Sequence, residues 1–138
     1  MNNKEIKFRN KSEKYSILIG ENTINLLPEK IKSLCPMTKK IGVIIDKNLL
    51  TKYKQMLKNK LRGYEISFLF FTANEKNKSL DQVNLILNAL LSKNLNRSDL
   101  IIGVGGGITG DVASFAASIF KRGINFINIP TTLLAQVD

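Results

Sequence analysis

The chain begins with two short runs in which apolar and polar residues alternate, from Glu5 to Phe8 and from Tyr15 to Ile19. Alternation with a period of two is typical of a strand with one covered face. The polar segment RNKSEK between the two runs supplies the residues of a turn. The first twenty residues therefore predict an antiparallel β-hairpin.

After the hairpin, helix-like patterns recur along the chain. Three segments carry apolar residues every three or four positions, as one buried face of a helix requires. They contain Ile24, Leu27, Ile31 and Leu34, ending before Pro36; Leu49, Tyr53, Met56, Leu57 and Leu61, ending at Gly63; and Val83, Ile86, Leu87, Leu90 and Leu91, ending near Asn94. A fourth helix is expected from about Thr109 to Lys121, with Val112, Phe115, Ala116 and Ile119 in the core.

Four apolar runs between these helices predict strands: KKIGVIID, YEISFLFF, DLIIGVG and INFINIP. The first is nearly uniformly apolar from Ile41 to Ile45, which fits a strand covered on both faces. Strands that alternate with helices form β-α-β units. We therefore expect an α/β fold with a Rossmann-like, mostly parallel sheet, flanking helices and the N-terminal hairpin. No repeat or linker divides residues 1–138, so one domain is expected.

The distribution of charged and apolar residues argues against nucleic acids and membranes as partners. The formal net charge is +10, but the 19 basic and 8 acidic side chains of residues 1–98 are spread over every predicted element. The basic residues are mostly lysines and are not interleaved with aromatic residues, so no nucleic-acid partner is expected. No apolar run is long enough to span a bilayer, so no membrane partner is expected either.

The N-terminus and the single cysteine indicate where the protein is located and which kind of catalysis is not expected. The N-terminus is polar and lacks the apolar middle of a secretory signal, which favours a cytoplasmic protein. A single cysteine, Cys35, can form no internal disulfide. No histidine is present to activate its thiol, so a nucleophilic cysteine is not expected.

A glycine-rich stretch, GVGGGITGD at residues 103–111, follows the apolar run Leu100 to Ile102. Glycines at 105, 106 and 107 can take positive φ and let backbone amides approach a phosphate, and the next helix points its positive end at the same place. The stretch lacks the Gly-Lys-Ser/Thr ending of the triphosphate-binding loop and departs from G-x-G-x-x-G in register. A strand-to-helix turn without a ligand therefore remains an alternative.

Polar residues follow each predicted strand of the sheet. In an open α/β sheet, ligands bind outside the carboxyl ends of the strands. The residues at these ends are Asp46 and Asn48, Glu75 and Lys78, Asp111, and Thr131 and Thr132. Structural alternatives stand beside this interpretation: Asp46, Asn48 and Ser79 are helix caps by type, Asp111 suits the first turn of a helix, and Arg122-Gly123 suits a helix end.

From Gly105 onward, the run GGGITGDVASFAASIFKRGINFINIPTTLLAQVD resembles 3-dehydroquinate synthases. The matching features are the triple glycine, Gly-Asp, the alanine-rich helix ending in Arg-Gly, and Pro-Thr-Thr-Leu-Leu followed by Val-Asp. Upstream, NEKNKS stands where the family has Gly-Glu-x-x-Lys-Ser, and IIDKN where it has an Asp-x-Asn turn. The resemblance thus covers essentially the whole chain.

This resemblance implies an enzyme that converts 3-deoxy-D-arabino-heptulosonate 7-phosphate into 3-dehydroquinate and phosphate, in the shikimate pathway of aromatic amino acid biosynthesis. It implies NAD that is reduced and reoxidised within one turnover, and a divalent metal, zinc or cobalt. Residues 1–138 would be the NAD-binding α/β domain. A homodimer is also implied.

Roles carry over from the family to matching positions. Asp46 and Asn48 would hold the adenosine ribose. The other cofactor contacts would be Asn74, Glu75, Lys76, Asn77 and Lys78 for the nucleotide; Gly106, Gly107, Ile108, Thr109, Gly110 and Asp111 for the pyrophosphate and ribose; and Thr131, Thr132 and Leu134 on the nicotinamide side. Arg122 would reach substrate phosphate from a neighbouring subunit, and Asp138 would contact substrate.

The chain departs from the family at three places. Asn74 replaces a loop glycine and Thr109 an aliphatic residue. The chain also ends at Asp138, where the family continues into a helical domain that carries a glutamate and two histidines as metal ligands. We therefore expect a truncated chain that is inactive alone and holds no metal ligands. Another sugar phosphate cyclase, a metal-dependent polyol dehydrogenase and a non-catalytic nucleotide-binding module remain the alternatives.

Overall fold

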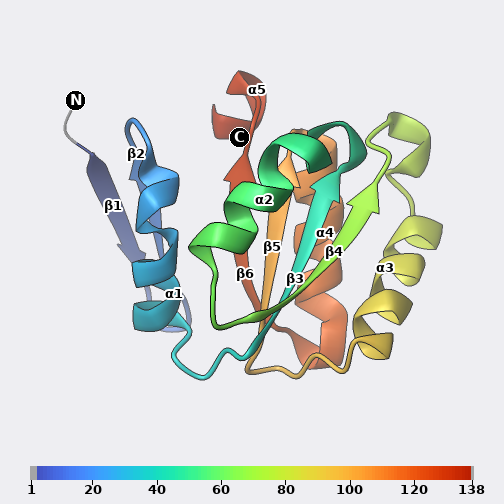
Figure 1. Ribbon diagram of the computed structural model, residues 1–138, viewed down its shortest axis with the longest axis horizontal. Coiled ribbons are helices and arrows are strands. Elements are labelled where there is room, and N and C mark those ends of the chain that lie inside the picture. Colours follow the sequence, from blue (N-terminus) through green and yellow to red (C-terminus); the bar gives the residue numbers. More distant parts are fainter. Residues whose placement is uncertain (1–2, 138) are drawn as a thin grey trace.

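The computed structural model describes residues 3–137 and consists of a hairpin beside a four-stranded sheet with helices on both faces (Figure 1). Strands β1 (Lys4–Arg9) and β2 (Lys14–Ile19) pair antiparallel, as the alternating pattern predicts. A 3₁₀ turn at Thr23–Leu26 then leads into α1 (Leu27–Leu34), which has a proline in its first turn and ends before Cys35.

The main sheet is parallel and has the order β4-β3-β5-β6. Its strands are β3 (Lys40–Asp46), β4 (Glu65–Phe71), β5 (Leu100–Gly105) and β6 (Asn125–Pro130). The two central strands, β3 and β5, are buried along almost their whole length, as their uniformly apolar runs predict. This confirms the expected α/β fold.

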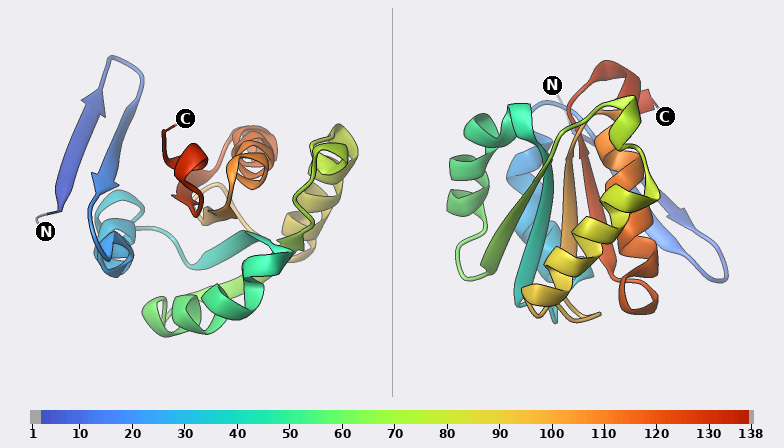
Figure 2. Two further views of the ribbon diagram at one scale, coloured as in Figure 1. Left: turned by 90° about the horizontal axis from the view of Figure 1, so that it is seen from above. Right: turned by 90° about the vertical axis from the view of Figure 1, so that its right-hand side faces the viewer.

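Helices cover the two faces of the sheet (Figure 2, left). Helices α1 and α2 (Leu50–Lys60) pack on one face, against Ile41, Val43 and Ile45 of β3. Helices α3 (Leu80–Ser92) and α4 (Gly107–Ile119) pack on the other, against Ile44 of the same strand. Because successive side chains of a strand point to opposite faces, one apolar run serves both cores. A last helix, α5 (Leu133–Val137), follows β6.

The order of the strands reverses beside β3. The crossover through α2 takes the chain from β3 to β4 along one face, and the crossover through α3 returns it along the other face to β5, on the opposite side of β3. The carboxyl ends of β3 and β5 therefore form a topological switch point.

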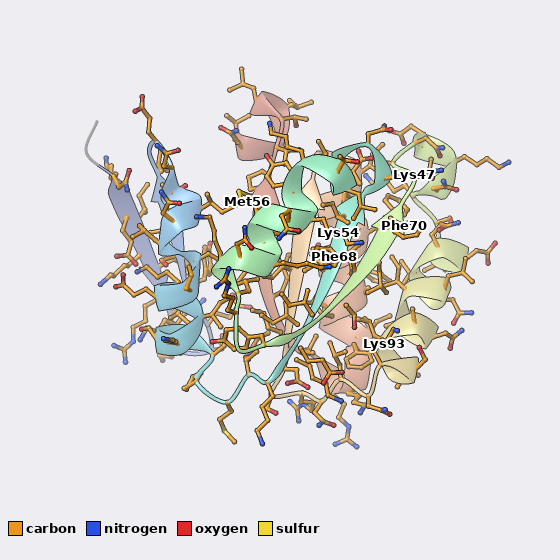
Figure 3. The ribbon with its side chains drawn as sticks, viewed as in Figure 1. Lys47, Lys54, Met56, Phe68, Phe70 and Lys93 are labelled. Atoms are coloured by element: carbon orange, nitrogen blue, oxygen red, sulfur yellow. The ribbon has the colours of Figure 1, made fainter. Side chains whose placement is uncertain are left out.

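Several side chains expected in the core are half exposed: Leu34 (48%), Leu91 (50%), Phe115 (45%) and Ile119 (47%). They lie at the margins of the apolar stripes, next to the polar faces of their helices. Helix α4 begins at Gly107, two residues earlier than expected, so Asp111 lies beyond its first turn. On the edge strand β4, Phe70 is 64% exposed, whereas Phe68 lies under the Lys54 ammonium, 5.8 Å from the ring centre (Figure 3).

Among residues 3–137, no helix combines the length and apolar character needed to cross a bilayer. Cys35 is buried at the end of α1, and this burial raises the pKa of its thiol.

A buried carboxylate fixes the loops at the amino edge of the sheet. Asp99, 3% exposed, accepts hydrogen bonds from the backbone N–H groups of Lys39 (3.0 Å), Lys40 (2.9 Å) and Asn96 (2.8 Å). Burial alone would raise the pKa of Asp99, but these three donors outweigh burial and hold its pKa below the ordinary value. Asp99 thus ties the segment before β3 to the segment before β5.

We predict that Asp99→Asn lowers the free energy of unfolding by about 2 to 4 kcal/mol at pH 7, because an amide nitrogen would face a buried N–H group. A carboxyl whose folded pKa is depressed stabilises the fold above its unfolded pKa, near 4, and loses this contribution as the pH falls through the folded pKa. The difference between variant and wild type should therefore shrink in acid, as measured by urea unfolding at several pH values. Asp81→Asn, at an exposed position, is the control; an equal effect of both variants would contradict the assignment.

Candidate functional site

The glycine loop joins β5 to α4 at the switch point. Gly105 ends the strand, Gly106 caps the helix, and Gly107 is its first residue. None of the three has positive φ, so the expectation of left-handed backbone here is wrong. Space is the constraint instead: a Cβ on Gly105 would lie 2.7 Å from Cβ of Thr109, and one on Gly106 would lie 3.3 Å from Cγ2 of Thr132.

The segment after β6 lies directly against this loop. The N–H group of Thr131 donates to the carbonyl of Gly105 (2.9 Å), and the Thr132 hydroxyl accepts from the N–H group of Ala135 (3.2 Å). Leu134 extends from α5 with 72% of its surface exposed. The structure therefore brings Thr131 and Thr132 to the glycine loop, whereas Asp138 lies outside the described residues.

Asp46 reaches the same edge from β3. Its strand pairs with β5, with Ile45 opposite Val104, so Asp46 stands next to the end of β5. One carboxylate oxygen accepts from the N–H group of Asn48 (3.0 Å) and caps the 3₁₀ turn Lys47–Leu49 that leads into α2. The interpretation of Asp46 as a cap is thus confirmed, and it is compatible with a ligand at the second carboxylate oxygen.

The loop between β4 and α3 is held by its own asparagines. Asn74 accepts from the N–H group of Asn77 (2.8 Å), and the Asn77 amide donates to the carbonyl of Thr72 (2.8 Å). Glu75 and Lys76 are exposed in the turn between them. Ser79 caps α3 through the N–H group of Gln82 (3.3 Å), as expected.

Lys78 connects this loop to α4. Its ammonium lies 2.8 Å from Oδ2 of Asp111, and both side chains are largely exposed. The hydrogen bond and charge of Asp111 raise the pKa of Lys78. A groove of about 360 Å³ runs between α3 and α4 beside this pair, lined by Lys78, Ser79, Leu80, Val83, Asp111, Val112 and Phe115.

The first turns of α4 contain one unpartnered polar atom. Thr109 is fully buried under Gly105, and its hydroxyl has no hydrogen-bond partner. Ile108 packs against the core of the α3–α4 face. Gly110 faces Asn128 on β6, whose amide oxygen would lie 3.4 Å from an added Cβ. Sequence reasoning did not single out Asn128, although a polar amide within the apolar run INFINIP was a usable signal.

Arg122 lies apart from the other candidate residues. It precedes β6, at the amino edge of the sheet, with a left-handed backbone (φ 69°). There it lines a shallow groove with Arg97, whose Nε donates to the carbonyl of Gly123 (3.4 Å). The other candidate residues described here gather at the carboxyl edge, so one copy of the chain does not bring Arg122 to them.

The residues of the carboxyl edge suit a ligand with phosphate and hydroxyl groups. A helix N-terminus and a glycine loop favour anions, the Lys78 ammonium adds positive charge, and carboxylates such as Asp46 accept hydrogen bonds from hydroxyls. A metal does not fit: residues 3–137 hold no group of three or more Cys, Asp or Glu side chains that could bind one, and the chain contains no histidine.

Comparisons with known proteins agree with one another. Residues 68–138 match a family model described as 3-dehydroquinate synthase N-terminal. A 3-dehydroquinate synthase of Pelagibacter ubique is 46% identical over 97% of this chain, and one of Clostridium botulinum is 42% identical over 98%. The chain spans only 36% and 39% of these relatives.

Among solved structures, a 2-deoxy-scyllo-inosose synthase complexed with carbaglucose-6-phosphate, NAD⁺ and Co²⁺ superposes with a TM-score of 0.81. The two proteins are 25% identical, and the match covers 96% of this chain and 36% of that one. Its fold thus agrees with that of the described residues.

We predict that Gly105→Ala lowers the free energy of unfolding by about 1 to 3 kcal/mol, because the new methyl group overlaps Thr109. Gly110→Ala is the matched control, since its methyl group would make an ordinary contact and alanine favours the helix by about 0.5 to 1 kcal/mol. Thermal unfolding of both variants checks the difference. Equal stability of the two variants would show that the loop has room for a side chain.

Thr109→Val should raise the free energy of unfolding by about 1 to 2 kcal/mol, because valine keeps the shape and removes a buried hydroxyl without a partner. Thr109→Ser keeps the hydroxyl and loses a methyl group, so it should be less stable than wild type. Urea unfolding measures both. A destabilised valine variant would mean that the hydroxyl does have a partner.

Proposed function

The chain belongs to the 3-dehydroquinate synthase family, and on this basis we propose that residues 1–138 are the NAD-binding domain of such an enzyme. The complete enzyme would convert 3-deoxy-D-arabino-heptulosonate 7-phosphate into 3-dehydroquinate and phosphate. This chain alone would be inactive, since it spans about a third of its relatives. The observation that carries the proposal is the glycine loop at the switch point, with Lys78 and Asp46 on either side of it.

The geometry of the loop supports NAD as the ligand. The close packing of Gly105 and Gly106 against Thr109 and Thr132 excludes side chains and leaves backbone at the edge, where the N-terminus of α4 favours a pyrophosphate. The related 2-deoxy-scyllo-inosose synthase binds NAD⁺. NAD, when bound, would supply the acceptor and later the donor of a hydride.

The residues of this chain would bind and orient the cofactor. Asp46, with Asn48, would accept hydrogen bonds from the adenosine ribose, and Lys78 would offer its charge to the nucleotide. Gly106 and Gly107 would approach the pyrophosphate through their backbone. The other residues proposed to contact the cofactor are Asn74, Glu75, Lys76, Asn77, Ile108, Thr109, Gly110, Asp111, Thr131, Thr132 and Leu134.

For Thr109, only the backbone is available for such a contact, because its side chain is fully buried. The described residues of this chain do not form a metal-binding site, because they contain no group of three or more Cys, Asp or Glu side chains that could hold an ion. The zinc or cobalt ion of the proposed enzyme would be held by residues that this chain does not contain. Residues 3–137 would therefore not supply the metal ion that polarises the substrate.

The position of Arg122 supports a homodimer. Arg122 lies at the amino edge of the sheet, away from the glycine loop of its own chain. If it contacts substrate phosphate, it must do so in the site of another copy. The proposal also includes Asp138 as a substrate contact and a cytosolic location, which the single buried thiol of Cys35 supports.

We expect the 138-residue chain to bind NAD in isothermal titration calorimetry and to release no phosphate from the sugar phosphate substrate. Lys78→Met should weaken NAD binding about tenfold, because a charge-assisted contact is lost. Lys93→Met is the matched control: this lysine follows α3 at the end distant from the glycine loop (Figure 3).

The binding and activity measurements test the cofactor assignment, the role of Lys78 and the expected inactivity separately. Absence of NAD binding by a folded chain would contradict the cofactor assignment. Equal loss of affinity in the Lys78 and Lys93 variants would contradict the proposed role of Lys78. Phosphate release by this chain would contradict its expected inactivity.

A further inference from the structure

A run of left-handed backbone connects α4 to β6 at residues 121–123, here called the left-handed turn. Lys121 and Arg122 have φ of 45° and 69°, and Gly123 follows with φ of 110°. Left-handed backbone crowds the Cβ atom of an L-residue against a carbonyl oxygen, so two consecutive residues other than glycine are strained here. The other residues of positive φ in the described part of the chain are of types that tolerate it: Gly20, Asn22, Gly63 and Asn94. Such strain persists only where the surrounding contacts hold it.

Three hydrogen bonds hold the left-handed turn. The N–H group of Gly123 donates to the carbonyl of Phe120 (2.8 Å), and the N–H group of Ile124 donates to the carbonyl of Ala117 (3.0 Å). Both of these bonds come from the backbone on either side of the turn. The third comes from a distant part of the chain, because Nε of Arg97 donates to the carbonyl of Gly123 (3.4 Å).

Arg97 is itself fixed by the turn that leads into β5. The N–H group of Asn96 donates to Oδ2 of the buried Asp99 (2.8 Å), and the N–H group of Asp99 donates to the carbonyl of Asn96 (3.0 Å). The other oxygen of the same carboxylate accepts from the N–H groups of Lys39 and Lys40, ahead of β3. Arg97 therefore extends from a point that is tied to both central strands.

Arg122 gains little from the fold for the strain that it carries. Its side chain is exposed, and its guanidinium forms no hydrogen bond or ion pair with residues 3–137. Arg97 and Arg122 line the same groove of about 400 Å³ at the amino edge of the sheet. Strained backbone at a residue that adds no contact to the fold is typical of a functional position.

We propose that Arg97 is a positioning residue for Arg122. Its hydrogen bond to the carbonyl of Gly123 keeps the left-handed turn closed, and the closed turn fixes the direction in which the Arg122 guanidinium leaves the sheet. A guanidinium held in one direction loses less conformational freedom when it binds a phosphate. This inference rests on the contact with substrate phosphate proposed above for Arg122 and names the residue that prepares it.

The test removes the Nε donor of Arg97 from the 138-residue chain in two ways. Arg97→Met keeps an unbranched side chain but has no N–H donor. Arg97→Gln places an amide N–H group at the same number of bonds from Cα as Nε. Because both variants lose the charge, a difference between them reports the donor alone.

Nuclear magnetic resonance follows the left-handed turn in these variants. A residue of positive φ gives a strong nuclear Overhauser effect between its own N–H and Hα protons, and we expect this signal at Arg122 to weaken in Arg97→Met and to persist in Arg97→Gln. The Gly123 amide should exchange with solvent about fivefold faster in Arg97→Met, the effect of one lost hydrogen bond. Arg62→Met is the matched control, because Arg62 is an exposed arginine in the turn between α2 and β4 at the same edge. Circular dichroism verifies that each variant is folded.

A second variant tests the strain without removing either arginine. Glycine takes left-handed backbone at no steric cost, so Lys121→Gly should slow the exchange of the Gly123 amide below the wild-type rate. Combined with Arg97→Met, it should restore the left-handed signal at Arg122. Faster exchange in Lys121→Gly would contradict the assignment of strain to the turn.

The outcomes separate this inference from the proposed function. A left-handed signal at Arg122 that persists in Arg97→Met, or that is lost equally in Arg97→Gln, overturns the positioning role of Arg97. Binding of NAD by the same variants should equal that of the wild type, because Arg97 precedes β5 and the glycine loop follows it. A wild-type chain that binds no NAD would contradict the cofactor assignment and leave the role of Arg97 standing.

Discussion

The pairing of β3 with β5 is the constraint on which the other features of the molecule depend. Both strands are buried on their two faces, so each must supply apolar side chains in both directions along its whole length. The strands remain paired up to Ile45 and Val104, but the loop after β3 leads to α2 on one face of the sheet and the loop after β5 leads to α4 on the other. The glycine loop and Asp46 lie side by side where these two loops separate.

The amino edge of the sheet is held together by a buried side chain, unlike the carboxyl edge. There Asp99 joins segments that are about sixty residues apart in the sequence, through hydrogen bonds to their backbone. One end of the sheet is thus fixed by a buried carboxylate, while the other has the half-buried Asp46 at the end of β3 and the exposed Asp111 on α4. This division separates the part of the molecule that secures the fold from the part that is open to a ligand.

The local patterns of the sequence were sufficient to predict every strand, the hairpin and the edge at which the polar residues gather. They did not predict features that depend on contacts between residues far apart in the sequence, such as the burial of a side chain at a helix margin. Periodicity shows which face of a helix points inward, but not where the sheet beneath it ends, so Phe115 and Ile119 were wrongly expected in the core. The role of Asp99 was not predicted, since two of its three hydrogen-bond partners, the backbone N–H groups of Lys39 and Lys40, lie about sixty residues away in the sequence. The glycine loop was located correctly, but close packing against Thr109, not left-handed backbone, explains its composition.

The ion pair between Lys78 and Asp111 has a consequence for how this edge recognises a ligand. The Asp111 carboxylate lies 2.8 Å from the Lys78 ammonium, which has three N–H donors and can therefore bind a second acceptor beside Asp111. The pair as a whole carries no net charge, so it attracts a distant anion less than an isolated lysine would. At close range it offers N–H donors and a carboxylate acceptor side by side, which suits a molecule that carries both acceptor and hydroxyl groups. Selectivity at this pair therefore depends on hydrogen-bond geometry rather than on net charge.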